Sequence, residues 1–540
     1  MIPQQDSSSR NRMREKKMVA CGVFNGHIQN DVPRSTSHHI PSRTANRTSM
    51  RSAAFFSAFA LAVAVPGTTG TGIVDAILAE GRPARSDEEP VRREMEERLA
   101  ADRAALERFR PGYTFWKYVF TIPDGQIAFG SAQDGHLLAS FPTRGDWDRG
   151  ARWQDDSLAG VLDGVRLPQK VDERRDEVAQ VLEREIGPVI HNPTRGGFLL
   201  PNARRYGAFL GEWGAIYERF GVPAEVGLAQ AVVESGLSGK VKSEAKAIGF
   251  CQWLPRNWKR LDGLTPDPLE AENQTTQAPY CAAYLSVLAT KYHSFIPALS
   301  EHHAGGANVG RTLINGQRLG GADVREQYFL GSDFAQDLRT LSPRTFRKVI
   351  GSYGPRSHLY AEMVFGNAAT IEQIRTDTPQ DQIYAIRTSR AFTMIEITQR
   401  TGLSAEKLKR YNPALARRVP KGANLYLPVQ GGQFGTDVSF WHRPATDAYQ
   451  AVLADFLALE ATPDEWDQPS FDRVLADFRR RFRDTRSEEG AVMDVVLGYV
   501  MQEMPLTRRV LNEFRGSREV RDLFQQGVTQ RAMAMAETGA

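Results

Sequence analysis

The sequence predicts a multidomain, mainly α protein with a small β-containing module near the N-terminus and a second small module built as strand, helix, helix, strand. Three observations lead to this class. A chain of 540 residues is too long for one ordinary core, so two to four domains are expected. Helical periodicity runs through residues 203–367 and 440–540, with Pro and Gly between segments. Aromatic and β-branched runs broken by turn residues are found at 113–142 and 384–428.

The charge of the chain is unevenly distributed. Residues 1–51 contain nine Lys or Arg and three acidic residues, a surplus of six cations. Because the whole chain has a formal net charge of +4, the remainder is slightly negative, at −2. Hydrophobic residues make up 41% and charged residues 24%, as in a soluble globular protein. A globular body near neutrality lacks the basic surface that nucleic-acid binding needs, so nucleic acid is not an expected partner.

The first 79 residues are predicted to lie outside the folded body. Residues 1–49 are polar and rich in Ser, Asn and Arg, which predicts a disordered leader, and the simplest explanation is that translation begins at Met50. Residues 50–79 then show a cation at Arg51, an apolar run over 53–65 and a Pro/Gly/Thr break. This run is too short to cross a bilayer but has the order of a secretory signal, so we expect export. The alternative is an uncleaved segment that anchors the chain or is buried.

The folded body contains two cysteines, Cys251 and Cys281, because Cys21 falls in the leader. In an oxidising compartment they could form one disulfide, which stabilises a loop of this length by roughly 3 kcal/mol. The alternative is a pair of buried free thiols. Neither belongs to a CxxC pair, so the sequence predicts no metal site, and it predicts no cofactor.

The N-terminal region, residues 80–200, is predicted to combine one helix with the small β-containing module. Residues 87–110 are charged at helical spacing, which predicts an exposed helix with little core. Asp124-Gly125 and Asp134-Gly135 are hairpin signals within 113–142, and we expect the module to end near residue 145. Beyond it, residues 146–200 predict one helix, "VDERRDEVAQVLEREIG", and a loop that contains Pro193 and Gly196-Gly197.

Glu234 is the strongest candidate for a catalytic residue. It lies in the last turn of a predicted helix that begins at Pro223 and ends at Gly236, beside Val232 and Val233. Apolar surroundings and the negative end of the helix dipole both favour the neutral carboxyl, so we expect a raised pKa. A carboxylic acid that is protonated near neutrality suits general-acid catalysis. The plain alternative is a glutamate at a helix end that reaches into water.

The residues that follow Glu234 keep a definite spacing. Ser235 stands at +1, Ser243 at +9, Gly249 at +15 and Gln252 at +18, with Pro255 at +21. This spacing resembles the "ES…S…AxGLMQ…P" signature of soluble lytic transglycosylases, goose-lysozyme-like enzymes that cleave peptidoglycan. The resemblance implies a lysozyme-like α+β catalytic domain over residues 201–370. It implies Glu234 as the single acid/base, Ser235 in support, Ser243 and Gln252 at the substrate, and Gly249 where the backbone approaches the glycan closely.

Further along, the sequence departs from the family pattern. In "SEHHAGGANVGRTL", His302 and His303 stand where the family has the Tyr and Asn of "AYNAG", and Tyr360 in "SHLYAEMVFGN" matches a late family tyrosine. We expect all three at the substrate, because imidazoles can also donate hydrogen bonds. The two imidazoles, His302 and His303, would make activity sensitive to pH at about 6 to 7. A metal site of Glu301, His302 and His303 is disfavoured because adjacent side chains diverge on a helix.

Residues 382–430 resemble a LysM domain, the βααβ module that binds glycans containing N-acetylglucosamine. The positions that carry the resemblance are Ile386, Phe392, Ile395, Leu408, Asn412-Pro413, Gly422 and Leu425. The usual Gly-Asp-Thr after the first strand is replaced by Ser389-Arg390-Ala391, which touches the sugar-binding loop. A Gly/Gln-rich linker is expected at 429–437, and residues 440–540 form a helical region.

Together these resemblances predict an exported, periplasmic lytic transglycosylase without a cofactor. Its expected partners are peptidoglycan glycan strands, and wall-remodelling or secretion machinery is a further candidate. One alternative is a muramidase that hydrolyses the same bond with water, with Glu244 or Glu301 as a second carboxylate. The other is a peptidoglycan-binding protein without catalytic activity, which the His302-His303 replacement suggests.

Overall fold

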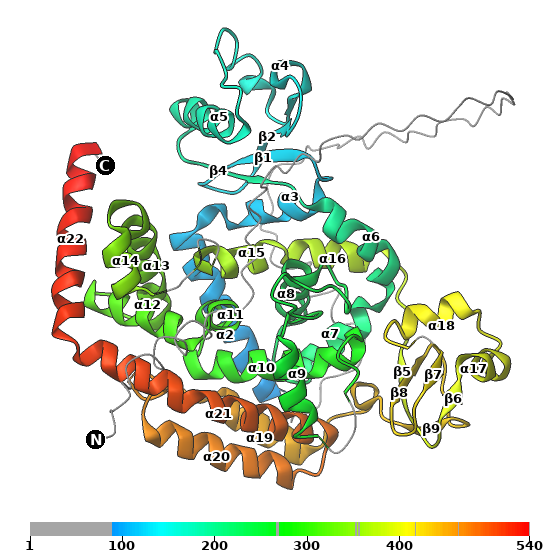
Figure 1. Cartoon of the computed structure of the whole chain (residues 1–540). Helices are drawn as coiled ribbons and strands as arrows, with labels where there is room; N and C mark the ends of the chain where they lie inside the picture. The colour runs from blue at the N-terminus through cyan, green and yellow to red at the C-terminus, as the bar shows by residue number, and fades with distance from the viewer. Residues whose placement is uncertain are drawn as a thin grey trace, which may run out of the picture. The chain divides into compact units, whose positions relative to one another are not determined.

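The computed structural model describes residues 89–538, except 266–268, 352–353, 355–356, 416 and 463 (Figure 1). It is mostly helical with small antiparallel sheets, which confirms a mainly α fold class. The expected leader and signal, residues 1–79, lie outside the described residues. Within the described ranges, none of the helices combines the length and apolar character needed to span a bilayer.

A four-stranded antiparallel sheet forms the N-terminal β module, in the order β3-β2-β1-β4. Its strands are β1 (Gln126–Ser131), β2 (Leu137–Pro142), β3 (Arg152–Trp153) and β4 (Val189–Pro193). The β1–β2 turn contains Gly135 at φ +73°, where a residue without a side chain is favoured, as the Asp-Gly signal predicts. The helix α5 (Val171–Ile186) contributes Val178 and Leu182 to the module's own core.

This module extends past its predicted end at residue 145. Pro193, expected in a loop with Gly196-Gly197, is the last residue of the strand β4, which pairs with the free edge of β1, with Phe129 opposite His191. Gly196-Gly197 then begin the helix α6 (Gly196–Tyr206). β1 and β4 are separated by about sixty residues, so no local sequence pattern predicts their pairing. The edge of β1 supplies the hydrogen bonds that the backbone of β4 needs.

The first described helix, α2 (Glu89–Phe109), is not the exposed helix that its charged sequence predicts. Arg98 and Asp102 are buried. The Asp102 carboxylate accepts 2.6 Å hydrogen bonds from Ser294 Oγ and the Phe295 backbone N–H, and Arg325 Nε lies 2.6 Å away. The prediction failed because it assigned these charges to solvent, whereas paired charges can be buried when their hydrogen bonds are satisfied.

Eleven helices follow between residues 196 and 377 in the described part of the chain: α6, α7 (Leu210–Glu218), α8 (Ala224–Ser235), α9 (Pro255–Asp262), α10 (Gln274–Tyr292), α11 (Phe295–Ala304), α12 (Gly306–Arg318), α13 (Val324–Leu341), α14 (Pro343–Val349), α15 (Tyr360–Gly366) and α16 (Ala368–Asp377). The helix α8 begins after Pro223 and ends at Gly236 in the left-handed conformation, as expected. Almost every residue of α10 is buried, so this helix lies at the centre of the region.

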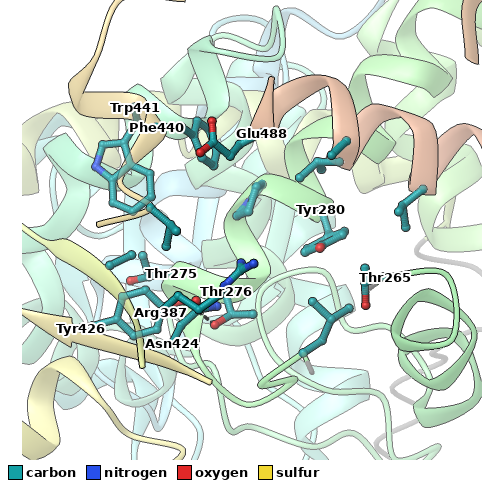
Figure 2. Close-up of a pocket in the computed structure, with 17 residues that line it drawn as sticks. Thr265, Thr275, Thr276, Tyr280, Arg387, Asn424, Tyr426, Phe440, Trp441 and Glu488 are labelled. Carbon is teal, nitrogen blue, oxygen red and sulfur yellow. Dashed lines mark hydrogen bonds between the residues drawn. The ribbon is translucent and has the colours of Figure 1, made fainter. Parts of the chain in front are cut away.

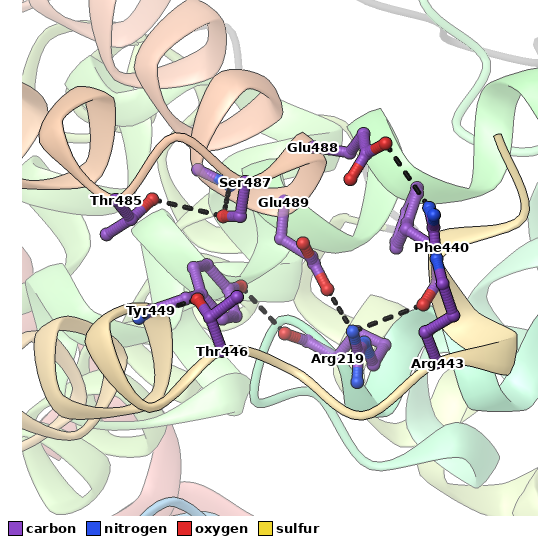
Figure 3. Close-up of polar contacts among 10 residues, drawn as sticks. Arg219, Phe440, Arg443, Thr446, Tyr449, Thr485, Ser487, Glu488 and Glu489 are labelled. Atoms are coloured by element: carbon purple, nitrogen blue, oxygen red, sulfur yellow. Dashed lines mark hydrogen bonds and ion pairs between the residues drawn. The ribbon is translucent and has the colours of Figure 1, made fainter.

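The C-terminal helices α19 (Asp447–Leu457), α20 (Pro469–Asp484), α21 (Glu488–Gly516) and α22 (Arg518–Thr538) share one hydrophobic core with the central helices. Figure 3 shows one polar connection between the two regions. The Arg219 guanidinium pairs with Glu489 and donates to the Phe440 carbonyl, while Tyr449 Oη donates to the Arg219 carbonyl at 2.7 Å. The C-terminal helices therefore do not form a core of their own.

The module at 384–437 contains the predicted strand, helix, helix and strand, together with two further short strands that pair with each other. Its elements are β5 (Tyr384–Thr388), β6 (Phe392–Thr393), α17 (Met394–Thr401), α18 (Ala405–Tyr411), β7 (Arg418–Val419) and β8 (Asn424–Leu427). β5 pairs with β8, and Ile386 lies opposite Leu425. The expected linker contains a further strand, β9 (Gly435–Asp437), which covers the other edge of β5. An uncovered edge would leave backbone groups unpaired, and β9 satisfies them.

One core position of this module differs from the prediction. Ile386, Phe392, Leu408 and Leu425 are buried, but the side chain of Ile395 is 70% exposed. Two residues later, Ile397 fills the core position on α17. Residues two apart point to different faces of a helix, so the resemblance selected the wrong isoleucine.

Candidate active site around Glu234

Glu234 lies in the last turn of α8 with its side chain 12% exposed, so the carboxyl is largely buried but reachable. The hydroxyl of Tyr360, the first residue of α15, donates a 2.5 Å hydrogen bond to Glu234 Oε1. His302 Nε2, from the last turn of α11, lies 3.5 Å from the same oxygen. Three helices far apart in the sequence thus converge on one carboxyl group.

The pKa of Glu234 differs from its expected direction. Burial alone raises it, as the apolar neighbours predict. The His302 hydrogen bond, the charges of His302 and His303, and the hydrogen bond from Tyr360 act in the opposite sense. These interactions outweigh burial, and the pKa of Glu234 lies below its ordinary value. The expectation of a raised pKa was wrong because it counted only the neighbours along α8.

The two histidines and Tyr360 form a stacked group. The ring centroid of His303 lies 4.7 Å from that of Tyr360 at 20°, and the ring of His302 lies at 6.4 Å and 23°. His303 Nδ1 is 3.0 Å from Ser357 Oγ. Burial and the neighbouring Glu234 raise the pKa of Tyr360, so its hydroxyl keeps its proton and remains a donor. Of the residues predicted at the substrate, these three are gathered around Glu234.

Ser243, Gly249 and Gln252 come together in a different way, within the loop 241–253. Ser243 Oγ accepts a 3.0 Å hydrogen bond from the Ala247 backbone N–H. Gln252 Nε2 donates to the carbonyls of Val241 and Gly249, at 3.2 and 3.1 Å. The amide nitrogen of Gln252 is thus committed to the loop, and its Oε1 is buried without a hydrogen-bond partner among the residues described. In this structure these side chains shape the loop.

At Gly249, where the resemblance implied a close approach of the glycan, the backbone is approached closely by a side chain of the protein itself. Gly249 has φ +71°, and a Cβ built there would lie 2.0 Å from Gln277 Nε2 on α10. Gln277 Oε1 in turn accepts a 2.9 Å hydrogen bond from the Phe250 backbone N–H. One residue further, Cys251 is joined to Cys281 by a disulfide with a Cα separation of 5.8 Å. The loop is therefore held against α10 by packing, a hydrogen bond and a covalent link.

The remaining predicted polar residues turn away from the Glu234 carboxyl. Ser235 is fully buried, and its hydroxyl donates to the Ala231 carbonyl at 2.8 Å. Glu301 lies next to His302 in sequence, but its carboxylate is 2.6 Å from Lys291 Nζ and accepts from Tyr292. Glu244 is exposed. Among the described residues, no group of three or more His, Cys, Asp or Glu side chains is arranged to hold a metal ion.

Sequence reasoning missed an aromatic wall next to His302. The Tyr284 ring meets His302 edge-on at 5.9 Å and packs on Trp253 at 5.1 Å. Tyr499 of α21 lies 6.0 Å from both Tyr284 and Trp253. Trp253 directly follows Gln252 and could have been suspected from its place. Tyr499 lies in the C-terminal region and carries no local signal of this role.

In comparison with known proteins, the chain matches no family model and no curated sequence. At this site a largely buried carboxyl accepts a hydrogen bond from a tyrosine, lies 3.5 Å from an imidazole and is 12% exposed. Such a group can exchange a proton with a bound molecule.

Proposed function

We propose that this protein is a peptidoglycan lytic transglycosylase, with Glu234 as its single acid/base. The observation that carries the proposal is the Glu234 carboxyl, 12% exposed and held by Tyr360 and His302. The spacing from Glu234 to Gln252, which resembles the signature of these enzymes, supplies the substrate class. The strand-helix-helix-strand module at 384–427 adds support, because a glycan-binding module suits an enzyme that works on the cell wall.

In the proposed reaction, protonated Glu234 donates its proton to the oxygen that bridges N-acetylmuramic acid and N-acetylglucosamine. The bond from C1 of the muramic residue to that oxygen breaks, and the oxygen leaves as the C4 hydroxyl of the glucosamine. The Glu234 carboxylate then takes the proton of the muramic C6 hydroxyl, whose oxygen bonds to C1 and closes a 1,6-anhydro ring. Glu234 ends protonated again, and no water is consumed.

His302 explains how a carboxyl with a lowered pKa can serve as the acid. Glu234 and His302 lie 3.5 Å apart and can hold one proton between them. In the free protein, the charges of His302 and His303 favour the carboxylate form of Glu234. A glycan bound over Glu234 excludes water, which penalises two separate charges and favours the neutral pair with the proton on Glu234. His302 is thus a positioning residue, which acts on the reaction through the Glu234 carboxyl.

A muramidase would need a second carboxylate to activate water. Glu301 is engaged with Lys291 and Tyr292, which disfavours it for that task. Glu244 is exposed on the loop 241–253 and remains available for a test.

The experiment treats purified peptidoglycan with wild-type protein, Glu234→Gln and Glu244→Gln, followed by mass spectrometry of the released fragments. Wild type is expected to release fragments with anhydro ends, which are one water lighter than reducing ends. Glu234→Gln should lower the rate by about 10²–10⁴-fold, and Glu244→Gln should leave it unchanged. Reducing ends, lost in Glu244→Gln, would instead identify a muramidase. No release by wild type, with retained binding to the wall material, would identify a binding protein.

A further inference from the structure

A second site lies away from Glu234. A partly open cavity of about 180 Å³ is lined by the βααβ module, by α10 with Thr265 and Leu269 before it, and by the first turns of α21. None of the residues predicted at the active site lines it. Figure 2 shows its walls, with Trp441, Tyr280 and Tyr426 placed around the space. A space of this size holds on the order of a dozen waters, or one small organic ring system with its substituents.

The walls of the cavity are amphipathic. Trp441, Tyr280 and Tyr426 supply aromatic surface, and Val492 and Val495 of α21 supply aliphatic surface. Aromatic rings with a polar atom at one edge suit a ligand with both apolar faces and hydroxyl groups.

Arg387 of β5 is a charged side chain that lines the cavity, and the carboxylates at or beside the cavity are already paired. Glu488 pairs with Arg443 at 3.3 Å. The Glu270 carboxylate accepts from the Asn424 backbone N–H at 2.9 Å and from Thr276 Oγ1 at 3.1 Å. Asn424 Oδ1 is buried, and no hydrogen-bond partner for it is found among the described residues. The carboxylates are thus engaged, and the Arg387 guanidinium offers hydrogen-bond donors to the hydroxyl and carbonyl oxygens of a polar ligand.

The part of the cavity wall around Trp441 and Glu488 is held in place by contacts within the protein, before any ligand binds. Figure 3 shows how the start of α21 is held: Glu489 pairs with Arg219, and Ser487 Oγ accepts from the Gly490 backbone N–H at 3.0 Å. Trp441 Nε1 donates to Glu212 Oε2 at 2.7 Å, which sets the orientation of the indole. A site whose walls are already ordered loses little conformational entropy when a ligand binds.

We propose that this cavity binds one N-acetylated pyranose unit of a glycan. The C–H face of a pyranose suits the aromatic surface, its hydroxyls suit the Arg387 guanidinium, and an acetyl methyl suits the valines of α21. The choice of an N-acetylated sugar rests on the proposed function. The site uses the sheet side of the βααβ module, at β5 and β8, and not the loop Ser389-Arg390-Ala391. It would hold the glycan at a second point while Glu234 acts elsewhere.

The test uses 5-fluorotryptophan and ¹⁹F NMR on the full chain with Glu234→Gln, so that the ligand is not consumed. The chain has eight tryptophans, and the resonances of Trp441 and Trp253 are assigned by their loss in Trp441→Phe and Trp253→Phe. Trp441 reports on the cavity, and Trp253 reports on the loop beside the Glu234 site. The probe is chitotriose, a trimer of N-acetylglucosamine, and cellotriose is the control without acetyl groups.

Chitotriose is expected to shift the Trp441 resonance, and cellotriose is not. Ala491→Phe, at an exposed position of α21 that lines the cavity, should abolish this shift without loss of folded structure by circular dichroism. A shift at Trp253 with none at Trp441 overturns the inference and leaves the proposed function standing. A shift at Trp441 that survives Ala491→Phe, or that cellotriose produces equally, also overturns it. A shift at Trp441 without one at Trp253 supports the cavity and counts against glycan binding beside Glu234.

Discussion

The hydroxyl of Tyr360 donates a 2.5 Å hydrogen bond to Glu234 Oε1 across 126 positions of sequence. Tyr360 is the first residue of α15 and Glu234 lies in the last turn of α8, so the contact joins the start of one helix to the end of another. Because burial and Glu234 raise the pKa of the phenol, its hydroxyl keeps its proton and remains a donor at neutral pH. The contact therefore orients the carboxyl before any substrate arrives.

Tyr360→Phe should lower kcat by about 10–100-fold with little change in KM, because it removes the hydrogen bond that orients Glu234 and keeps the ring stacked on His303. The cost in stability should be about 1–2 kcal/mol. Muropeptide release and urea unfolding measure the two effects. Tyr449→Phe is the matched control, since it removes a buried hydroxyl bonded to the Arg219 carbonyl. It should cost similar stability and leave kcat intact, and an equal loss of kcat in both variants would contradict an orienting role.

The effect of Glu234→Gln on stability should change sign when His302 is absent. In the wild type the pKa of Glu234 is depressed, so its ionisation stabilises the fold above the ordinary pKa of about 4.5, and this is lost as pH falls through the lower folded value. His302→Phe removes the two largest causes that lower the pKa of Glu234, so burial, the largest single cause, should raise the folded pKa. Stability then falls as pH rises from about 4.5 toward that raised value.

Urea unfolding of the four variants at pH 4 and pH 7 measures this reversal. At pH 7, Glu234→Gln should destabilise the wild-type protein and stabilise the His302→Phe protein, each by about 1 kcal/mol or more. At pH 4 both differences should shrink. Because His302 is absent from both proteins of the second pair, its own titration cancels there. The same sign in both backgrounds would show that His302 does not set the pKa of Glu234.

Asp102→Ala should destabilise the protein by about 3–5 kcal/mol, because it leaves Arg325 and the backbone N–H of Phe295 without their buried partner. Glu96→Ala is the control on the same helix, since Glu96 is exposed and pairs only with the exposed Arg92 among the described residues. It should change stability by less than about 0.5 kcal/mol. Thermal and urea unfolding measure both, and equal small effects would mean that α2 is not part of the central core.

Reduction of the Cys251–Cys281 disulfide should lower the free energy of unfolding by about 3–4 kcal/mol, given a sequence separation of 30. Unfolding with and without dithiothreitol measures this loss. The variant with both cysteines changed to Ala should lie near the reduced wild type and should not respond to the reductant. If dithiothreitol lowered the stability of that variant too, its effect on the wild type would not be due to the Cys251–Cys281 disulfide.

Local chemistry in the sequence predicted several elements correctly. Pro223 and Gly236 mark the ends of α8, because proline suits a helix start and glycine accepts the left-handed conformation at its end. Asp134-Gly135 marks the β1–β2 turn, and the order of strands and helices at 384–427 follows from their spacing. Each of these depends on residues a few positions apart, so a window of sequence contains the cause.

The tertiary structure decided what depends on distant residues. It brought Tyr360 and His302 to Glu234, so the pKa of Glu234 is lowered where its neighbours along the chain predict a raised one. It also buried Asp102, because Arg325 pairs with its carboxylate. It also added β9 to the sheet edge of β5. Electrostatic interactions and strand pairing depend on distance in space, and the sequence alone does not contain those distances. The sequence thus determined which carboxyl is the candidate acid, and only the fold determined which groups control its proton.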